Sequence, residues 1–264
     1  MDYTEYSQLA ISRQGAVLTI SLNRPDTRNA IDEDLHRELA RIFRDVDGDD
    51  DTDVVILTGA GGCFCAGGNL DWVLSMHGDP IRTSTAIRRD RRIQNDLLDL
   101  EKPIIAKVRG PAIGLGCSLA LFCDFVYATP QARFADPHVS VGLVAGDGGA
   151  VIWPQLIGYA RARRYLLTGD PISGAEAADI GLITVAVPED QLDAEVDALA
   201  DRLTSGATYS IKWTKASINA GLKVTANAII DRAAAFENLT QMMNDNRIAL
   251  EAFKAKAAPK FTGT

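Results

Sequence analysis

The chain has 264 residues, of which 47% are hydrophobic and 23% are charged, and this composition is ordinary for one large globular domain or a domain with an appendage. Its 27 basic and 35 acidic residues give a formal net charge of −8, which argues against general binding to nucleic acids or to anionic membranes. No apolar run reaches the ~20 residues that span a bilayer. The acidic N-terminus lacks the pattern of a secretory signal, so we expect a cytoplasmic protein without membrane partners.

The four cysteines lie in apolar or glycine-rich surroundings, which suits reduced thiols in the cytosol. Cys63 and Cys65 are close in sequence, but no second pair of ligands follows them at the spacing of a zinc site. We therefore predict no metal site.

The first sixty residues predict a hairpin, a helix and a buried strand. Apolar and β-forming residues over Leu9–Ser12 and Ala16–Leu22 flank a turn at residues 13–15. Apolar residues at helical spacing predict an amphipathic helix over Asp32–Asp47. The short apolar run Val54–Thr58 is typical of a strand in a parallel sheet. The glycines that follow it do not have the spacing of a dinucleotide-binding loop.

Residues 78–84 predict a mobile loop, Thr85–Leu100 a charged helix and Pro103–Val108 a second buried strand. The stretch Arg109–Tyr127 opens with glycines and then becomes almost wholly apolar, which predicts a helix buried on all sides. The free N–H groups of its first turn suit an anion, or an oxygen that becomes anionic during a reaction. The glycines alternatively serve only for close packing.

Further short strands are predicted at Phe125–Ala128, Arg133–Ala135 and Leu182–Val187, and two helices around residues 149–156 and 161–167. The repeated order of strand, glycine turn and helix indicates an α/β fold.

From Gln191 onward only helical patterns occur, with breaks near Gly206 and Gly221. The sequence thus divides into a core with the active site over residues 1–190 and a helical oligomerisation region over residues 191–264. The long apolar faces of this region predict packing against another subunit, or alternatively burial within the same chain.

Several motifs in the same order resemble the crotonase (enoyl-CoA hydratase/isomerase) superfamily along nearly the whole chain. They are Leu22–Pro25 with Arg28–Ile31, Phe64–Leu70, Lys102–Ala106 with Gly110–Asp124, Leu167–Gly169 with Ala175–Leu182, and Phe253–Gly263. The resemblance implies a spiral of ββα turns with a C-terminal helical trimerisation region. It also implies a trimer or a dimer of trimers, and an acyl thioester of coenzyme A as substrate, with no separate cofactor.

The resemblance further implies that two backbone N–H groups, those of Ala66 and Leu115, bind the thioester oxygen while the substrate becomes an enolate. Such a donor is typically worth ~10²–10³ in rate. Residues matching the coenzyme A contacts of the family, which alternatively form an ordinary basic surface, are Arg28, Ala30, Lys256, Lys260 and Phe261.

The chain departs from the hydratases of the superfamily, because Ser118 and His138 occupy the positions where those enzymes place glutamates. We therefore do not expect ordinary hydration with two glutamates. The remaining acid–base candidates are His138 and Asp147. Asp147 is alternatively a helix N-cap, Ser118 a small packing residue, and Asp136 a turn residue.

Three functions remain open on the sequence. The first is an enoyl-CoA hydratase/isomerase-type lyase or isomerase that works through an oxyanion-stabilised enolate. The second is a hydrolase of carbon–carbon bonds in a β-diketone or β-ketoacyl compound, because the Pro-His and Gly-Asp-Gly motifs are similar to those of the β-diketone hydrolase branch. The third is a non-catalytic acyl-CoA-binding protein.

Overall fold

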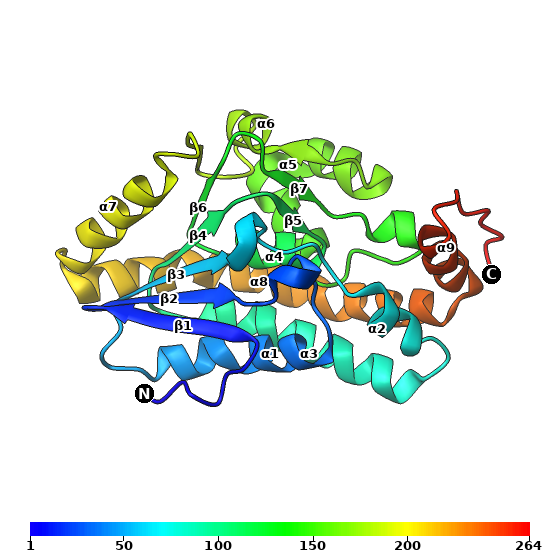
Figure 1. Cartoon of the computed structure of the whole chain (residues 1–264), viewed down its shortest axis with the longest axis horizontal. Coiled ribbons are helices and arrows are strands. Elements are labelled where there is room, and N and C mark those ends of the chain that lie inside the picture. The colour runs from blue at the N-terminus through cyan, green and yellow to red at the C-terminus, as the bar shows by residue number, and fades with distance from the viewer.

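The computed structural model describes residues 1–264 and shows a main sheet of six strands in the order β1-β2-β3-β4-β6-β9 (Figure 1). The first two strands form an antiparallel hairpin, and every other neighbouring pair in this sheet is parallel. The strands are β1 Leu9–Gln14, β2 Val17–Leu22, β3 Val54–Gly59, β4 Ile104–Val108, β6 Phe125–Ala128 and β9 Val185–Ala186.

A second, three-stranded sheet has the order β5-β7-β8, with β5 and β7 parallel and β7 and β8 antiparallel. Its strands are β5 Pro111–Ile113, β7 Arg133–Ala135 and β8 Ile172–Ser173. The chain passes from β4 in the first sheet directly to β5 in the second, so the two sheets wind around each other as the resemblance implies. The α/β spiral is thereby confirmed.

Nine α-helices and three short 3₁₀ helices surround the sheets. The α-helices are α1 Glu33–Asp47, α2 Leu70–Ser75, α3 Pro80–Asp99, α4 Leu115–Leu121, α5 Gly149–Thr168, α6 Gly174–Asp179, α7 Leu192–Thr204, α8 Thr208–Met242 and α9 Asn244–Lys254. The 3₁₀ helices are η1 Pro25–Thr27, η2 Ala60–Gly62 and η3 His138–Val141. None of the α-helices combines the length and the apolarity needed to cross a membrane.

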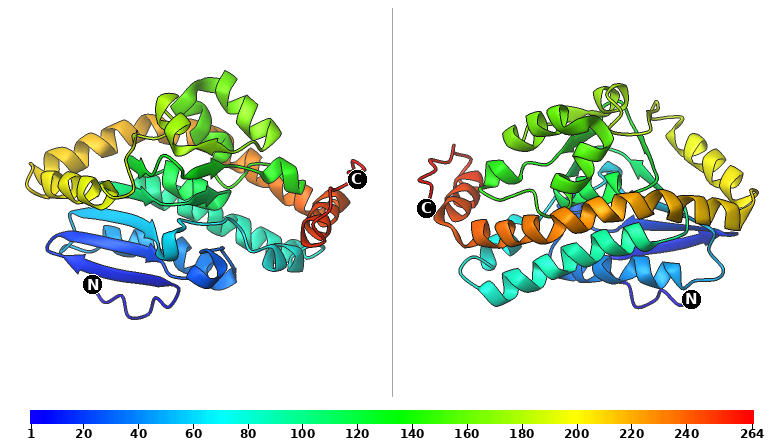
Figure 2. Two further views of the ribbon diagram at one scale, coloured as in Figure 1. Left: turned by 45° about the horizontal axis from the view of Figure 1, so that its top comes forward. Right: turned by 180° about the vertical axis from the view of Figure 1, so that it is seen from behind.

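The longest helix, α8, runs along nearly the whole back of the molecule, beside α3 (Figure 2). Ala226 and Ile230 of α8 belong to the same hydrophobic core as the strands. The helical region therefore shares the core of the rest of the chain, while its use in oligomerisation stays a prediction.

Helix α4 confirms the prediction of a fully buried helix, because all seven of its residues are buried. It is shorter than the apolar run around it, since β5 takes up the residues before it and β6 begins soon after. Its N-terminal end therefore lies inside the protein, next to the second sheet.

Three sequence predictions of local structure are wrong. The expected loop at residues 78–84 is the start of α3, because Asp79 accepts hydrogen bonds from the N–H groups of Ile81 and Arg82 and Pro80 occupies the first helical position. Gly221 lies inside α8, where packing against α3 and α5 outweighs the ~1 kcal/mol that a helical glycine costs. The strand predicted over Leu182–Val187 is shorter in the structure, where β9 covers only Val185–Ala186, because a turn occupies the residues before it.

Candidate active site

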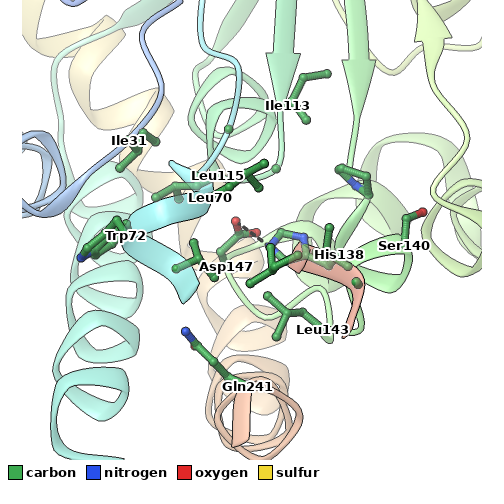
Figure 3. Close-up of a pocket in the computed structure, with 18 of the residues that line it drawn as sticks. Ile31, Leu70, Trp72, Ile113, Leu115, His138, Ser140, Leu143, Asp147 and Gln241 are labelled. Atoms are coloured by element: carbon green, nitrogen blue, oxygen red, sulfur yellow. Dashed lines mark ion pairs between the residues drawn. The ribbon is translucent and has the colours of Figure 1, made fainter. Parts of the chain in front are cut away.

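A mostly apolar cavity of about 330 Å³ lies where the N-terminus of α4, the η3 turn and the C-terminal half of α8 meet (Figure 3). Helices α2 and α3 form one wall, and α9 with the residues after it forms another. The two sequence-predicted acid–base residues, His138 and Asp147, both face this cavity.

The imidazole of His138 bridges two buried carboxylates. Its Nδ1 is hydrogen-bonded to Oδ1 of Asp136, and its Nε2 lies 3.2 Å from Oδ2 of Asp147. The Asp136 side chain is fully buried, and those of Asp147 and His138 are nearly so. Asp136, which the sequence suggested was a turn residue, is thus the residue that orients the histidine ring.

The predicted alternative that Asp147 caps a helix is wrong. The N-cap position of α5 is Gly148, and no side chain bonds the free N–H groups there. Oδ1 of Asp147 instead accepts a hydrogen bond from the hydroxyl of Ser118, 3.2 Å away on α4. The carboxylate therefore points into the cavity and is held from two sides.

Glycines explain how the loop carrying Asp147 reaches this place. A Cβ atom at Gly146 would lie 2.3 Å from Oε2 of Glu237, and one at Gly149 would lie 1.7 Å from Oδ2 of Asp136. No larger residue fits at either position without displacing these carboxyl groups. The glycines on both sides of Asp147 therefore let its loop pass close to α8 and to Asp136.

The electrostatics of the cluster favour a protonated histidine. Burial lowers the pKa of His138, but the carboxylates of Asp147 and Asp136 outweigh burial and raise it well above its usual value of 6.5. Burial in turn raises the pKa of Asp147, although the neighbouring imidazole opposes this. Because the two groups interact strongly, the protonation of one depends on that of the other.

Glu237 is a further acidic residue of the cavity that sequence reasoning missed. Burial raises the pKa of its carboxyl well above 4.5, which favours the neutral form, and its Oε2 has no hydrogen-bond partner. The available signal was the spacing on α8, where Ala226, Ile230 and Ala233 are buried and Glu237 continues the same face.

The predicted role of Ala66 in an oxyanion hole does not fit the structure. Its N–H donates to the carbonyl oxygen of Arg28 over 3.0 Å, so this amide is already satisfied and is not available to a substrate.

The free amide of this turn belongs to Gly68. Gly68 pairs with Ile31 in a single parallel β-bridge. In this bridge the N–H of Ile31 donates to the carbonyl of Gly67, and the N–H of Asn69 donates to the carbonyl of Ile31, each over 2.8 Å. In such a bridge the N–H of the central residue faces away from the partner strand. The Gly68 N–H has no acceptor, and the residue lines the cavity.

The N–H of Leu115 is the second free donor. It stands in the first turn of α4, where helix geometry leaves it without an intrahelical acceptor, and no other group accepts it. Leu115 borders the cavity (Figure 3). The structure thus brings both backbone donors, Gly68 and Leu115, to the cavity that holds His138 and Asp147.

The residues predicted to bind coenzyme A lie outside the cavity lining. Arg28 is exposed on the turn after β2, and the N–H of Ala30 is used by the carbonyl of Thr27. The other three, Lys256, Lys260 and Phe261, are exposed in the segment after α9. Their neighbours in sequence, Ala257 and Pro259, do line the cavity. The role of the predicted residues in binding coenzyme A stays a prediction.

Asp136, His138 and Asp147 also approach one another closely enough to be considered as metal ligands, within 4.8 Å. Both ring nitrogens of His138 already face carboxylate oxygens. The buried Oδ2 of Asp136 has no hydrogen-bond partner.

Comparison with known proteins agrees with this geometry. A family model described as enoyl-CoA hydratase/isomerase matches residues 12–264. The chain is 32% identical over 252 residues to the 1,2-epoxyphenylacetyl-CoA isomerase of Escherichia coli K12, covering 94% of this chain and 95% of the relative. It is 32% identical over 235 residues to the short-chain-enoyl-CoA hydratase of Clostridium acetobutylicum, covering 89% and 88%.

Among solved structures, an enoyl-CoA hydratase/isomerase from Mycobacterium paratuberculosis superposes with a TM-score of 0.89 at 35% identity, covering 92% of this chain and 97% of that one. An enoyl-CoA hydratase from Mycobacterium avium subsp. paratuberculosis gives the same TM-score at 28% identity, covering 97% and 99%. The chain belongs to the enoyl-CoA hydratase/isomerase family of the crotonase superfamily.

Proposed function

We propose that this chain is an enzyme that moves a proton on an acyl-CoA thioester through an enolate, with Asp147 and His138 as its acid–base pair. The observation that carries this proposal is the position of the His138 imidazole, which lies between Asp136 and Asp147 in a cavity bordered by two free amides.

The amides of Gly68 and Leu115 are the proposed donors to the thioester oxygen. When a base removes a proton from the carbon next to the thioester carbonyl, the electron pair moves onto this oxygen, and fixed N–H donors stabilise the new charge without reorganising. The N-terminal end of α4 adds its positive dipole at the same place.

Asp147 is the proposed base, since its carboxylate faces the cavity and is oriented by Ser118 and His138. His138 takes part by sharing the proton, and Asp136 holds its ring. The same proton returns to carbon at a different position in an isomerisation. Addition of water held between two glutamates is not expected, since Ser118 and His138 take those positions.

The His138–Asp147 pair also supports a second candidate, hydrolysis of a carbon–carbon bond in a β-diketone or β-ketoacyl compound. An imidazole oriented by one carboxylate and facing another is suited to activating water. This candidate needs no coenzyme A.

Two measurements separate the candidates. Calorimetry compares binding of short and medium acyl-CoA thioesters with binding of free cyclic β-diketones. Nuclear magnetic resonance in ²H₂O follows exchange of the protons next to the thioester carbonyl. Binding of thioesters with enzyme-dependent exchange supports the enolate proposal. Binding of diketones alone, with ring cleavage, favours the second candidate, and binding of thioesters without any exchange favours a non-catalytic protein.

A further inference from the structure

The α8 wall of the cavity carries two polar side chains one helical turn apart, Glu237 and Gln241. Both residues are more than nine-tenths buried, with exposed fractions of 7% and 4%. Oε2 of Glu237 is buried near Gly146 without a hydrogen-bond partner. The side chain of Gln241 forms no hydrogen bond, while its backbone carbonyl accepts from Nδ1 of His77. The amide of Gln241 projects into the cavity, on the side away from Ile113 (Figure 3).

A third polar group faces the same cavity from α3. Oδ1 of Asp90 lies 2.6 Å from Nε2 of His36, a residue of α1 that is 1% exposed. Oδ2 of Asp90 has no partner. The buried histidine therefore fixes the carboxylate and leaves Oδ2 unpaired, and Asp90 lines the cavity together with the apolar Ala86 and Ile87.

These groups are not explained by the acid–base pair. Asp147 and His138 are satisfied by Ser118, Asp136 and each other. Leaving a buried donor or acceptor unpaired costs free energy, which a ligand regains when it supplies the missing partner. The rest of the cavity wall around these three side chains is mostly apolar.

We propose that Glu237, Gln241 and Asp90 form a polar subsite that binds a neutral oxygen function, a hydroxyl or carbonyl group, on the acyl chain of the substrate. This inference rests on the proposed function and adds a substrate class to it, namely oxygenated acyl thioesters. Glu237 and the Gln241 amide donate to such an oxygen, and the Gln241 carbonyl and Asp90 accept from a hydroxyl.

Charge limits the class to neutral groups. Asp90 and Asp147 line the cavity with carboxylates, Asp136 lies behind the His138 ring, and His138 is the one cationic side chain in the lining. A second carboxylate on the acyl chain would meet repulsion from Asp90 as well as the cost of its own burial. Dicarboxylic acyl thioesters are therefore excluded from the class.

The test compares coenzyme A thioesters of one chain length by calorimetry: hexanoyl-CoA, its forms with a hydroxyl or an oxo group at carbons 4, 5 and 6, and adipoyl-CoA. We expect the best oxygenated thioester to bind about 10- to 100-fold more tightly than hexanoyl-CoA, the range typical of one or two buried hydrogen bonds. Adipoyl-CoA should bind more weakly than either.

Two variants then locate the preference. Gln241→Leu keeps the size of the side chain and should remove most of the preference for oxygenated thioesters. Asp90→Asn should change the order of hydroxyl and oxo forms, since the amide also donates. The matched control is Met76→Leu, a change in the apolar wall of the same cavity, which should leave the ratio of the two affinities unchanged.

Equal binding of plain and oxygenated thioesters to the unmodified protein would overturn the subsite and leave the proposed function standing. A full preference that survives in Gln241→Leu would also overturn it, as would an unchanged order of hydroxyl and oxo forms in Asp90→Asn, or tightest binding of adipoyl-CoA. If no thioester of any kind binds, the proposed function falls together with the subsite.

Discussion

Nε2 of His138 lies 3.2 Å from Oδ2 of Asp147, although one residue follows β7 and the other precedes α5. Because Nδ1 of the same ring is bonded to Asp136, the imidazole is fixed between two carboxylates. Only the Asp147 side of this arrangement lines the cavity, since Asp136 does not border it. Asp147 is therefore the carboxylate that we expect a substrate to meet, and Asp136 is separated from the cavity by the ring.

The first prediction concerns Asp147→Asn. The variant keeps the size of the side chain but cannot accept a proton, so we expect turnover of the best substrate to fall by about 10²–10⁴, the usual contribution of acid–base catalysis. The melting temperature should fall, but the fold should persist, because asparagine fills the same space and only the negative charge beside the His138 ring is lost. Steady-state kinetics and thermal unfolding measure the two effects.

Ser118→Ala is the matched control for this variant. It removes the hydroxyl that donates to Asp147 and leaves the carboxylate in place, so it should reduce turnover far less. Full activity of Asp147→Asn on the best substrate would show that Asp147 is not the working base.

The second prediction concerns the pKa of His138 in Asp136→Asn. The negative charges of Asp147 and Asp136 raise this pKa against the effect of burial, while burial favours the neutral form of the Glu237 carboxyl. Removing one of the two charges should lower the pKa of His138, so the ring should lose its proton at a lower pH.

The titration of the ring C–H signals by nuclear magnetic resonance measures this shift, and only three histidines need to be assigned. The pH dependence of kcat/KM should move in the same direction. A His138 pKa that is the same in Asp136→Asn as in the unmodified protein would contradict the role given to Asp136.

The parts of the fold set by neighbouring residues follow from the sequence. Helix α1 has its apolar spacing and an N-cap aspartate, Asp32, within its own segment, and the structure confirms it. The buried helix α4 is equally visible in its composition. His138 and Asp147 are predicted as site residues from short motifs that resemble those of the crotonase superfamily.

The missed parts of the site depend on contacts between distant segments. Glu237 reaches the cavity only because Gly146 allows the loop to approach α8. The spacing on α8 indicates a buried face, but nothing near Glu237 in sequence indicates its contact with Gly146. Similarly, the choice between the amides of Ala66 and Gly68 depends on the register of one bridge to Ile31. The Ala66 amide meets the carbonyl of Arg28, whereas the Gly68 amide faces away from Ile31.

The third prediction concerns the stability of Glu237→Gln. Burial raises the pKa of Glu237 in the folded chain well above the unfolded value of 4.5, so the folded protein keeps a proton that the unfolded chain releases. The resulting stability is fully present below pH 4.5 and is lost as the pH rises toward the folded pKa. The loss is at most about 1.4 kcal/mol per pH unit.

Glutamine cannot ionise, so the free energy of unfolding of Glu237→Gln should exceed that of the unmodified protein by more at pH 8 than at pH 5. Urea unfolding at the two pH values measures this difference. The control Glu251→Gln changes an exposed glutamate of α9 and should show no such dependence. Parallel pH profiles for Glu237→Gln and the unmodified protein would contradict a neutral Glu237.

The fourth prediction compares the amides of Gly68 and Ala66. Replacing one peptide N–H by an ester oxygen, through incorporation of the matching α-hydroxy acid, removes a single donor. At position 68 the N–H has no partner in the protein, so stability should hold while turnover falls about 10²–10³. At position 66 the ester removes the bond to Arg28 and should cost about 1 kcal/mol of stability with little effect on turnover. The opposite pattern would restore Ala66 as the oxyanion donor.

The last prediction concerns the exposed apolar face of α8, which lies toward its N-terminal half. Trp213 is 59% exposed, and its ring centroid lies 5.3 Å from that of Tyr209, which is 68% exposed. Ile218 and Val224 continue the exposed apolar surface along the helix. A patch of this kind on one face of a long helix is typical of a subunit contact.

We therefore expect sedimentation velocity to show a trimer or a dimer of trimers at micromolar concentration. Trp213→Glu places a charge in the proposed contact and should shift the protein toward monomers, because an unpaired charge is costly to bury between subunits. Ala198→Glu adds the same charge at an exposed site on α7 and should leave the assembly unchanged. If the unmodified protein is a monomer, this face of α8 is not a subunit contact. If Trp213→Glu forms the same oligomer as the unmodified protein, the subunit contact lies elsewhere on the chain.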